Sequence, residues 1–322
     1  MFISIITPAY NRAETLHRCF ESLSKQSYKN FEWIIIDDGS VDNTAEVVAE
    51  WQRGSSMNIR YLKKPNGGKP SAVNQGVKLA GAEMCVILDS DDALCIDGLR
   101  ILVEAWQGLS LEVRDLYWCV CALVEDSVTK KVVGDLFPAH HISITGGEFQ
   151  FKYKITGEKF GLMRTALLKN NPYPESDGYK FVPESYIWNR LGRQYKYICL
   201  NSVVRTYFMP TGAAIGNLSG KANRIRNAKG LLICDVDVVN KDMPHWFSTS
   251  PVFFFKRAAQ LSRYGIHAKS LLHNFNSLES FWGKLLVLLS LPLGFTLYLG
   301  DKLWFKYYYS PARSKLSIDT VS

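Results

Sequence analysis

Three carboxylates follow an apolar run of the sequence and have the chemistry to hold a metal ion. Residues 84–88 have the composition of a buried strand, and Asp89, Asp91 and Asp92 come directly after it. Divalent cations such as Mg²⁺ and Mn²⁺ prefer oxygen ligands, typically one or two carboxylates together with phosphate oxygens of a substrate. The competing interpretation is a strand-ending turn, with Asp92 as the N-cap of a helix over residues 93–106.

A second cluster has the composition of a phosphate-binding loop. Gly67, Gly68 and Lys69 precede a helix predicted over residues 71–79. Backbone amides at a helix N-terminus, with a lysine beside them, suit a phosphate group, although loops of this composition are common. No GxGxxG or GxxxxGK[ST] motif occurs at the predicted strand ends, so neither a dinucleotide site of the Rossmann type nor a P-loop is indicated.

The elements that carry these clusters alternate between strand and helix. Apolar runs predict strands over 2–7, 31–36, 59–62 and 84–88, and amphipathic spacing predicts helices over 14–26, 45–51, 71–79 and 96–106. This alternation predicts an α/β fold, with a mainly parallel twisted sheet flanked by helices. Ligands of such sheets bind beyond the carboxyl ends of the strands, and there lie the polar segments 8–11, 37–40, 66–69 and 89–92.

The pattern changes after residue 110. We expect two strands joined by a turn, over 116–124 and 131–136, and further strands over 160–164 and 195–207. Helices are predicted over 185–191, 221–239 and 250–264. The seven cysteines are odd in number and form no CxxC pair, which indicates a reducing compartment.

The positive charge is unevenly distributed. The chain of 322 residues has 38 Lys and Arg against 30 Asp and Glu, for a formal net charge of +8. Residues 1–100 carry 11 basic and 13 acidic side chains, whereas residues 240–322 carry 10 and 4. A basic C-terminal region fits a nucleic acid, an anionic lipid or a solvated surface.

The C-terminal region also contains a strongly apolar segment. Residues 285–299 would form a helix of about 22 Å, short of the ~30 Å hydrocarbon core, and Pro292 and Gly294 interrupt it. Aromatic residues and lysines border it within 281–309. We expect this segment to associate with the membrane surface; a buried core helix and a true span are the alternatives. The apolar content, without a nucleic-acid-binding motif, argues against a nucleic-acid partner.

Five strings of the sequence, in order, carry a resemblance to a known family. They are S-I-I-T-P-A-Y-N (4–11), I-I-I-D-D-G-S (34–40), D-N-T (42–44), A-V-N-Q-G (72–76) and L-D-S-D-D (88–92). Together they resemble family 2 glycosyltransferases with the GT-A fold, strongly over 1–105 and more loosely to about 210. The resemblance implies a catalytic domain over 1–220, with a nucleotide-sugar half (1–105) and an acceptor half (106–220). A helical region over 221–322 would follow it.

The resemblance also implies roles for individual residues. Asp89 and Asp91 match the DxD pattern, with Asp91 as the direct ligand of Mn²⁺ or Mg²⁺. Asp37 matches the carboxylate that contacts the nucleotide base, which favours a UDP-sugar donor. The full set of nucleotide-sugar-binding residues expected from the resemblance is Thr7, Pro8, Tyr10, Asp37, Gly68, Lys69, Asn74, Asp89 and Ser90.

The general base is harder to place, because the sequence departs from the family pattern. The family supplies it from a Glu-Asp pair before a helix, and here the matching pair is Glu184 and Ser185. Glu184 is therefore the candidate base. Glu158 is a weaker alternative and Asp177 a weaker one still.

These observations predict a metal-dependent, inverting glycosyltransferase. It would move a sugar from a nucleotide sugar to a glycan or lipid-linked glycan acceptor, in surface polysaccharide synthesis. We expect a cytoplasmic protein, peripheral on the inner face of the cell membrane. The alternative, motivated by Ser185, is a nucleotide-sugar-binding protein at a membrane surface whose catalytic site has decayed.

Overall fold

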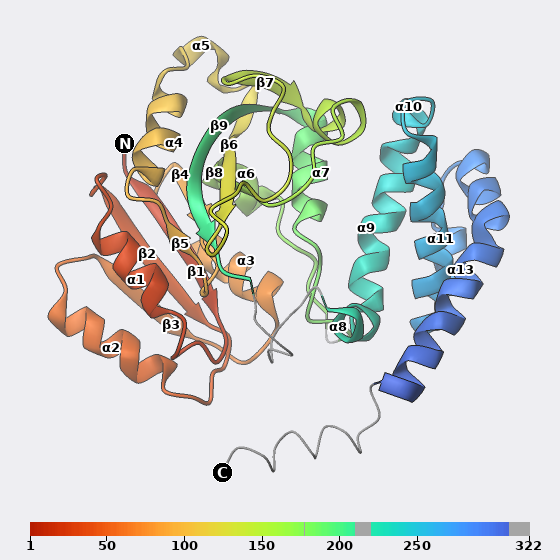
Figure 1. The fold of residues 1–322 in the computed structure, drawn as a ribbon, viewed down its shortest axis with the longest axis horizontal. Coiled ribbons are helices and arrows are strands. Elements are labelled where there is room, and N and C mark those ends of the chain that lie inside the picture. The colour runs from red at the N-terminus through yellow and green to blue at the C-terminus, as the bar shows by residue number, and fades with distance from the viewer. Residues whose placement is uncertain (177, 210–219, 309–322) are drawn as a thin grey trace. The chain divides into compact units, whose positions relative to one another are not determined.

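The chain divides into two compact units. The computed structural model describes residues 1–176, 178–209 and 220–308. The first unit comprises Met1–Lys180 and Glu184–Ala214, and the second comprises Phe181–Pro183 and Ile215–Ser322. The first unit is an α/β structure and the second is helical (Figure 1).

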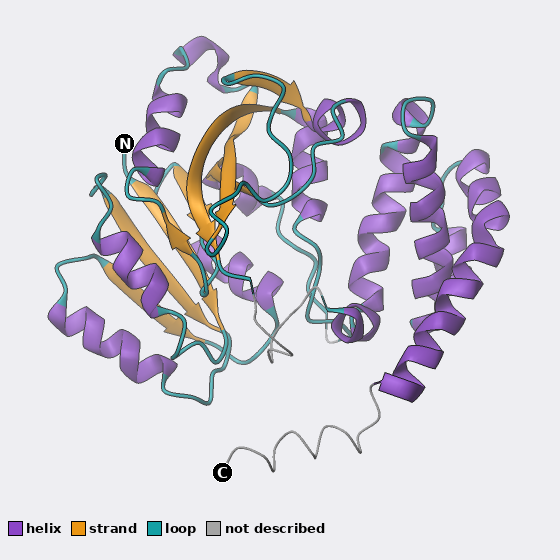
Figure 2. Cartoon of the chain, in the orientation of Figure 1, coloured by secondary structure: helices purple, strands orange, loops and turns teal. Residues whose placement is uncertain are grey.

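A mixed β-sheet forms the centre of the first unit (Figure 2). Its strand order is β3-β2-β1-β4-β8-β6-β9-β5, with β7 paired to β9. The first four strands are parallel, whereas β8 is antiparallel to both of its neighbours. The strands are β1 (Ile3–Ala9), β2 (Phe31–Asp37), β3 (Ile59–Lys63), β4 (Met84–Ile87), β5 (Ala93–Leu94), β6 (Tyr117–Asp126), β7 (Ile142–Thr145), β8 (Lys159–Arg164) and β9 (Lys196–Tyr207).

Helices cover both faces of this sheet, which confirms the predicted layering. On one face, Ile3 and Ile5 of β1 pack in one apolar core with residues of α1 (His17–Ser24), α2 (Thr44–Gly54) and α4 (Gly98–Gln107). Ile6 points to the other face, because successive side chains of a strand alternate. There it meets α3 (Lys69–Leu79): a Cβ on Gly76 would lie 2.3 Å from Ile6 Cγ2, so only glycine permits this approach.

Two predictions for this unit are wrong. The strand predicted over 2–7 ends too early, because β1 continues through Pro8 to Ala9 and the bend follows at Tyr10. β4 pairs with β1 only over Ile3–Ile6, so Pro8 lies past the end of that ladder and its missing N–H breaks no bond there. The predicted strand over 131–136 is also absent, and only Val132 forms an isolated bridge. Gly134 has φ +94° and sits against Thr156, which turns the chain away.

Three further helices and a π-helical turn complete the first unit. They are α5 (Leu111–Arg114), the π-helical turn Glu148–Lys152, α6 (Thr165–Asn170) and α7 (Ser185–Gln194). The side chain of Trp188 on α7 approaches the sheet at Gly161, where an added Cβ would lie 3.0 Å from its ring. α7 therefore packs over the part of the sheet that contains β8.

The second unit is a helical bundle. Its described helices are α8 (Lys221–Arg226), α9 (Ala228–Lys241), α10 (Met243–Trp246), α11 (Pro251–His267), α12 (Leu271–Asn276) and α13 (Phe281–Tyr308). The expectation that Pro292 and Gly294 interrupt the apolar segment is wrong, because α13 runs through both. By length and composition α13 could cross a membrane, and 28% of its apolar window is buried within the unit.

Candidate active site

The carboxyl ends of the parallel strands bring the polar clusters of the sequence together. Ala9 at the end of β1 is in register with Asp37 at the end of β2, and Asp37 with Lys63 at the end of β3. The backbone amide of Asp38 donates to the carbonyl of Ala9, and the side chain of Asn66 donates to the carbonyl of Asp38. The polar segments that follow β1, β2 and β3 therefore lie together at one edge of the sheet, as expected.

Lys69 joins two acidic residues that are far apart in the sequence. Its Nζ lies 2.6 Å from Asp89 Oδ1 and 2.6 Å from Glu184 Oε1. Burial acts to lower the pKa of Lys69, but the two carboxylates outweigh it and hold that pKa well above its ordinary value. The lysine is therefore charged, and it links the first aspartate of the DxD match to the candidate base.

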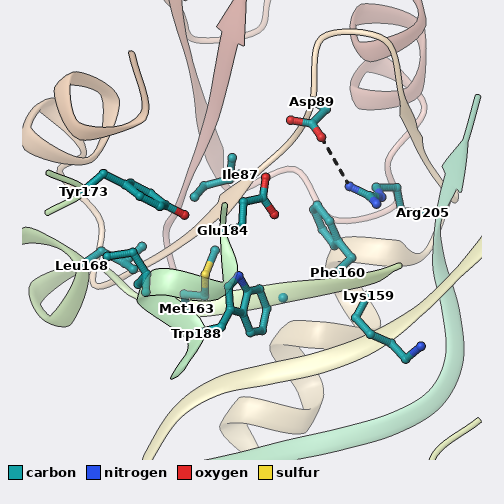
Figure 3. A pocket seen from close by; sticks show the side chains of 12 residues that line it. Ile87, Asp89, Lys159, Phe160, Met163, Leu168, Tyr173, Glu184, Trp188 and Arg205 are labelled. Atoms are coloured by element: carbon teal, nitrogen blue, oxygen red, sulfur yellow. Dashed lines mark ion pairs between the residues drawn. The ribbon is translucent and has the colours of Figure 1, made fainter. Parts of the chain in front are cut away.

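Arg205 of β9 is a second cation at this site; it is buried, and it contacts the other side of the same cluster. Its Nη2 lies 2.9 Å from Glu158 Oε2, and its Nη1 lies 3.4 Å from Asp92 Oδ2 and 4.0 Å from Asp89 Oδ2. Burial alone would raise the pKa of Asp89, but Lys69 and Arg205 outweigh it and hold that pKa below its usual range. Asp89 is thus ionised between two cations, and Figure 3 shows its ion pair with Arg205.

Asp92 does not cap a helix, contrary to the competing interpretation of the acidic cluster. α4 begins only at Gly98, after Asp97. Asp92 is fully buried, and its Oδ1 accepts a hydrogen bond from the backbone amide of Phe208. Burial raises its pKa to about 7 despite the nearby charge of Arg205. Asp92 therefore ties the DxD loop to the end of β9.

Asp91, like Asp89, has a carboxylate that reaches solvent from this loop. Its side chain is 29% exposed, and its Oδ2 lies 3.5 Å from Arg12 Nη2. In the described ranges no group of three or more His, Cys, Asp or Glu side chains could hold a metal. Asp91, with Asp89 next but one in the chain, offers a small set of oxygen donors, which fits a Mg²⁺ or Mn²⁺ ion that takes its remaining ligands from a diphosphate.

The two aspartates at the end of β2 both accept hydrogen bonds from within the protein. Asp37 Oδ1 accepts a hydrogen bond from the amide of Ser40, and its other oxygen accepts one from the hydroxyl of Tyr61. Asp38 accepts hydrogen bonds from the amides of Gly67 and Gly68. Asp38 thus holds the glycine loop, residues 66–69, for which the sequence predicts phosphate binding.

The backbone of that loop requires glycine at one position. Gly68 has φ +89°, and a Cβ there would lie 2.1 Å from the carbonyl oxygen of Lys180. Because Gly68 directly precedes α3, this conformation sets the point at which Lys69 enters the cluster.

The remaining donor-side candidates differ in their surroundings. Thr7 is buried and accepts a hydrogen bond from Trp33 Nε1 at 2.9 Å, whereas Tyr10 is exposed. Pro8 lies between them in β1, and Ser90 is buried with its carbonyl bound to Thr15. Asn74 bonds the backbone of Tyr173 and the side chain of Glu175, so it fixes the segment after α6. The nucleotide-binding roles of these residues stay predictions.

Of the candidate bases, Glu184 lines a pocket of the first unit (Figure 3). Glu184 stands at the start of α7 and Glu158 just before β8. Glu184 and Glu158 are both about half exposed; Glu184 is paired with Lys69, and Glu158 with Arg205. The pocket is lined by Ile87, Asp89, Lys159, Phe160, Gly161, Met163, Leu168, Tyr173, Glu184, Ile187, Trp188 and Arg205. The third candidate, Asp177, lies outside the described residues.

Sequence reasoning missed three residues of this site. Arg205, Arg12 and Asp38 each contact a candidate residue, but none was assigned a role. Arg12 follows directly on the 4–11 string, so its position was a usable signal. No local sequence pattern marks Arg205, because its acidic partners come from distant parts of the chain.

Known proteins share both the sequence motifs and the fold. Residues 4–155 match the model of glycosyl transferase family 2. Glycosyltransferase GlyG of Streptococcus pneumoniae is 40% identical over 112 residues, which cover 34% of this chain and 37% of the relative. A Campylobacter jejuni protein, GalNAc(5)-diNAcBac-PP-undecaprenol beta-1,3-glucosyltransferase, is 26% identical over 211 residues, 64% of each chain.

Solved structures are similar over nearly the whole chain. S. aureus TarS 1–349 in complex with UDP has a TM-score of 0.61 at 18% identity, and covers 96% of this chain and 93% of its own. Mannosyltransferase PcManGT of Pyrobaculum calidifontis, in complex with GDP-Man and Mn²⁺, has a TM-score of 0.54 at 17% identity, with 94% and 83% covered.

The sheet topology and these likenesses define the first unit as a GT-A fold, as expected from the sequence. The chain carries a glycosyltransferase domain of family 2, which confirms the resemblance drawn from its five strings. The GlyG alignment spans about a third of that relative's length, and alignments to several other curated relatives span less.

Proposed function

We propose that this protein is a metal-dependent, inverting glycosyltransferase that moves a sugar from a nucleotide sugar to a glycan or lipid-linked glycan acceptor. The observation that carries the proposal is the cluster around Lys69. One cation bonds Asp89 on the donor side and Glu184 at the pocket, both at 2.6 Å. In a glycosyltransferase, the carboxylate that binds the donor and the general base must lie around the same reacting centre. The sugar carbon that is attacked lies between them.

The residues of the chain divide the chemistry between them. Glu184 would accept the proton of the acceptor hydroxyl as that oxygen attacks the sugar. Lys69, which is partly buried, and Arg205, which is buried, supply positive charge beside the position expected for the leaving diphosphate. Asp91, together with Asp89, would hold Mn²⁺ or Mg²⁺, and such an ion supplies Lewis-acid stabilisation of the diphosphate.

The donor and acceptor classes follow from relatives and from the sequence. TarS binds UDP, and a UDP-sugar is the favoured donor here because Asp37 matches the base-contacting carboxylate. PcManGT binds GDP-Man with Mn²⁺, which supports the divalent ion. The name of the C. jejuni relative specifies an undecaprenol-linked acceptor. A role in surface polysaccharide synthesis, on the inner face of the cell membrane, fits such an acceptor.

Donor turnover by two variants tests the proposal. With Mn²⁺, the purified protein should hydrolyse one member of a panel of UDP-sugars or transfer its sugar to an acceptor. EDTA should abolish this turnover. Asp91→Asn should lower turnover at least a hundredfold. Asp115→Asn should not, because that carboxylate is 88% exposed and forms its ion pair with Arg164 at the surface. Full metal-dependent turnover by Asp91→Asn would refute the proposed mechanism.

The same experiment separates the second candidate function. Ser185 stands where the family pattern has an acidic residue, which favours a nucleotide-sugar-binding protein without turnover. Calorimetric binding of UDP, without hydrolysis or transfer on any donor or acceptor tested, would support that function instead.

A further inference from the structure

The outer face of α13 is apolar along its length. Exposed apolar side chains recur on it from Phe281 to Tyr307, and they include Leu288, Leu289, Leu293, Leu299 and Leu303. The opposite face of the helix is buried, through Gly283, Val287, Ser290, Gly294 and Asp301. A helix on a water-exposed surface normally carries polar side chains on its outer face, so this pattern indicates a binding surface.

The inner face of α13 packs closely against the backbone of α11. A Cβ on Gly294 would lie 2.5 Å from Ser262 Cβ and 2.7 Å from the carbonyl of Ala259. The two helices therefore touch where only glycine fits, and they lie side by side (Figure 1).

A buried ionic cluster fixes the same pair of helices further along. Asp301 of α13 is 1% exposed. Its oxygens accept hydrogen bonds from Arg263 of α11 at 2.6 Å each. His267 Nε2 lies 2.9 Å away and Lys221 Nζ of α8 lies 3.2 Å away. Removing one partner of such a cluster leaves buried charge uncompensated, which opposes separation of the helices.

We infer that α13 lies in the plane of an anionic membrane surface, with its outer face in the lipid and the rest of the helical unit above it. A spanning α13 would either carry Lys256, Arg257 and Arg263 of α11 into hydrocarbon or break the Asp301 cluster. The in-plane arrangement avoids both costs. This inference deepens the membrane-surface part of the proposed function, on which it rests.

Charge favours lipid over protein as the occupant. Residues 240–322 carry 10 basic and 4 acidic side chains. Lys302 and Lys306 are exposed near one end of the apolar face, and Trp282 is exposed near the other. Lysine stems and indole rings are suited to the level of lipid headgroups, where the lysine charge stays in water.

Sedimentation with vesicles tests the surface itself. The full chain should bind vesicles of phosphatidylglycerol and phosphatidylethanolamine more tightly than vesicles of phosphatidylcholine. Leu289→Asp combined with Leu303→Asp should weaken binding at least tenfold, because these side chains are 64% and 56% exposed on the outer face. Leu111→Asp makes the same change at a 77% exposed leucine of α5 and should leave binding unchanged.

Spin labels distinguish an in-plane helix from a spanning one. Labels at Leu289→Cys, Thr296→Cys and Leu303→Cys can be placed in a Cys95→Ser background, since the other six cysteines are buried. These positions share one helix face and extend over about 21 Å of its axis. We expect equal shallow depths at all three, whereas a spanning helix gives depths that differ by about 10 Å or more.

Three results would overturn the inference: no binding of the wild-type chain to anionic vesicles, a spanning depth profile, or a dimer in solution that the double aspartate variant dissociates. Donor turnover, measured without vesicles, reports separately on the proposed catalytic function.

Discussion

Arg205→Met should destabilise the first unit strongly. The change removes the guanidinium that faces Asp89, Asp92 and Glu158 within 4.0 Å, and it keeps an apolar stem of similar length. Arg205 is 5% exposed as a side chain and Asp92 is 1% exposed, so these charges have little access to water. Loss of one partner from a buried pair costs about 3–5 kcal/mol.

The contribution of each carboxylate can be separated. Glu158 is 49% exposed, so its pair with Arg205 accounts for about 1 kcal/mol or less. The larger share comes from Asp92 and Asp89. We therefore expect the free energy of unfolding to fall by about 3 kcal/mol, at the low end of the range for buried pairs. Arg205→Lys keeps the charge but loses the forked geometry of the guanidinium. Its free energy of unfolding should therefore lie between those of the wild type and Arg205→Met.

Urea unfolding at pH 7, followed by intrinsic fluorescence, measures this loss. Arg164→Met is the matched control, because its partner Asp115 is 88% exposed and the pair lies at the surface. The control should change stability by no more than about 1 kcal/mol. A loss for Arg205→Met no larger than that of the control would refute the reasoning, since the buried carboxylates would then not depend on Arg205.

Three other predictions follow from the geometry. Glu184→Gln should lower kcat about 10²–10⁴-fold in a transfer assay, and Glu158→Gln less; the reverse order would make Glu158 the base. Gly68→Ala should lower Tm markedly, because φ is +89° and the new Cβ has no room, whereas Gly54→Ala, with nothing within 4 Å, should not. The pKa of Asp301 is lowered: burial opposes this, but hydrogen bonds from Arg263 and His267 prevail. A carboxyl with a lowered folded pKa stabilises above its unfolded pKa, so Asp301→Asn should cost about 3 kcal/mol at pH 6, and this difference should shrink below pH 4.

The local parts of this structure were predictable from the sequence, and the long-range contacts were not. The parallel strands and the polar segments after them follow from hydrophobic pattern and from the geometry of parallel sheets. The Lys69–Glu184 contact joins residues 115 positions apart, which no local pattern reports. Arg205 falls within a predicted strand, but nothing in that strand identifies its acidic partners.

The errors in β1 and α13 share a physical cause. In both elements the sequence places an end or an interruption at proline or glycine: Pro8 follows the strand predicted over 2–7, and Pro292 and Gly294 fall within α13. In both elements tertiary packing overrides local propensity: Pro8 lies where one neighbouring strand has ended, and Gly294 provides the close contact between α13 and α11. In contrast, Gly134 was placed inside a predicted strand, and there its positive φ does end the strand pairing.

The position of β8 has a consequence for how the chain folds during synthesis. β8 inserts antiparallel between β4 and β6, yet it comes after both in the sequence. On a ribosome, β1 to β4 can pair as soon as they emerge, but the free edge of β4 must wait for about 75 more residues until Lys159–Arg164 is made. An open strand edge is a template for pairing with other chains. We therefore expect nascent chains released before β8 to aggregate, and released chains that include β8 to remain soluble longer.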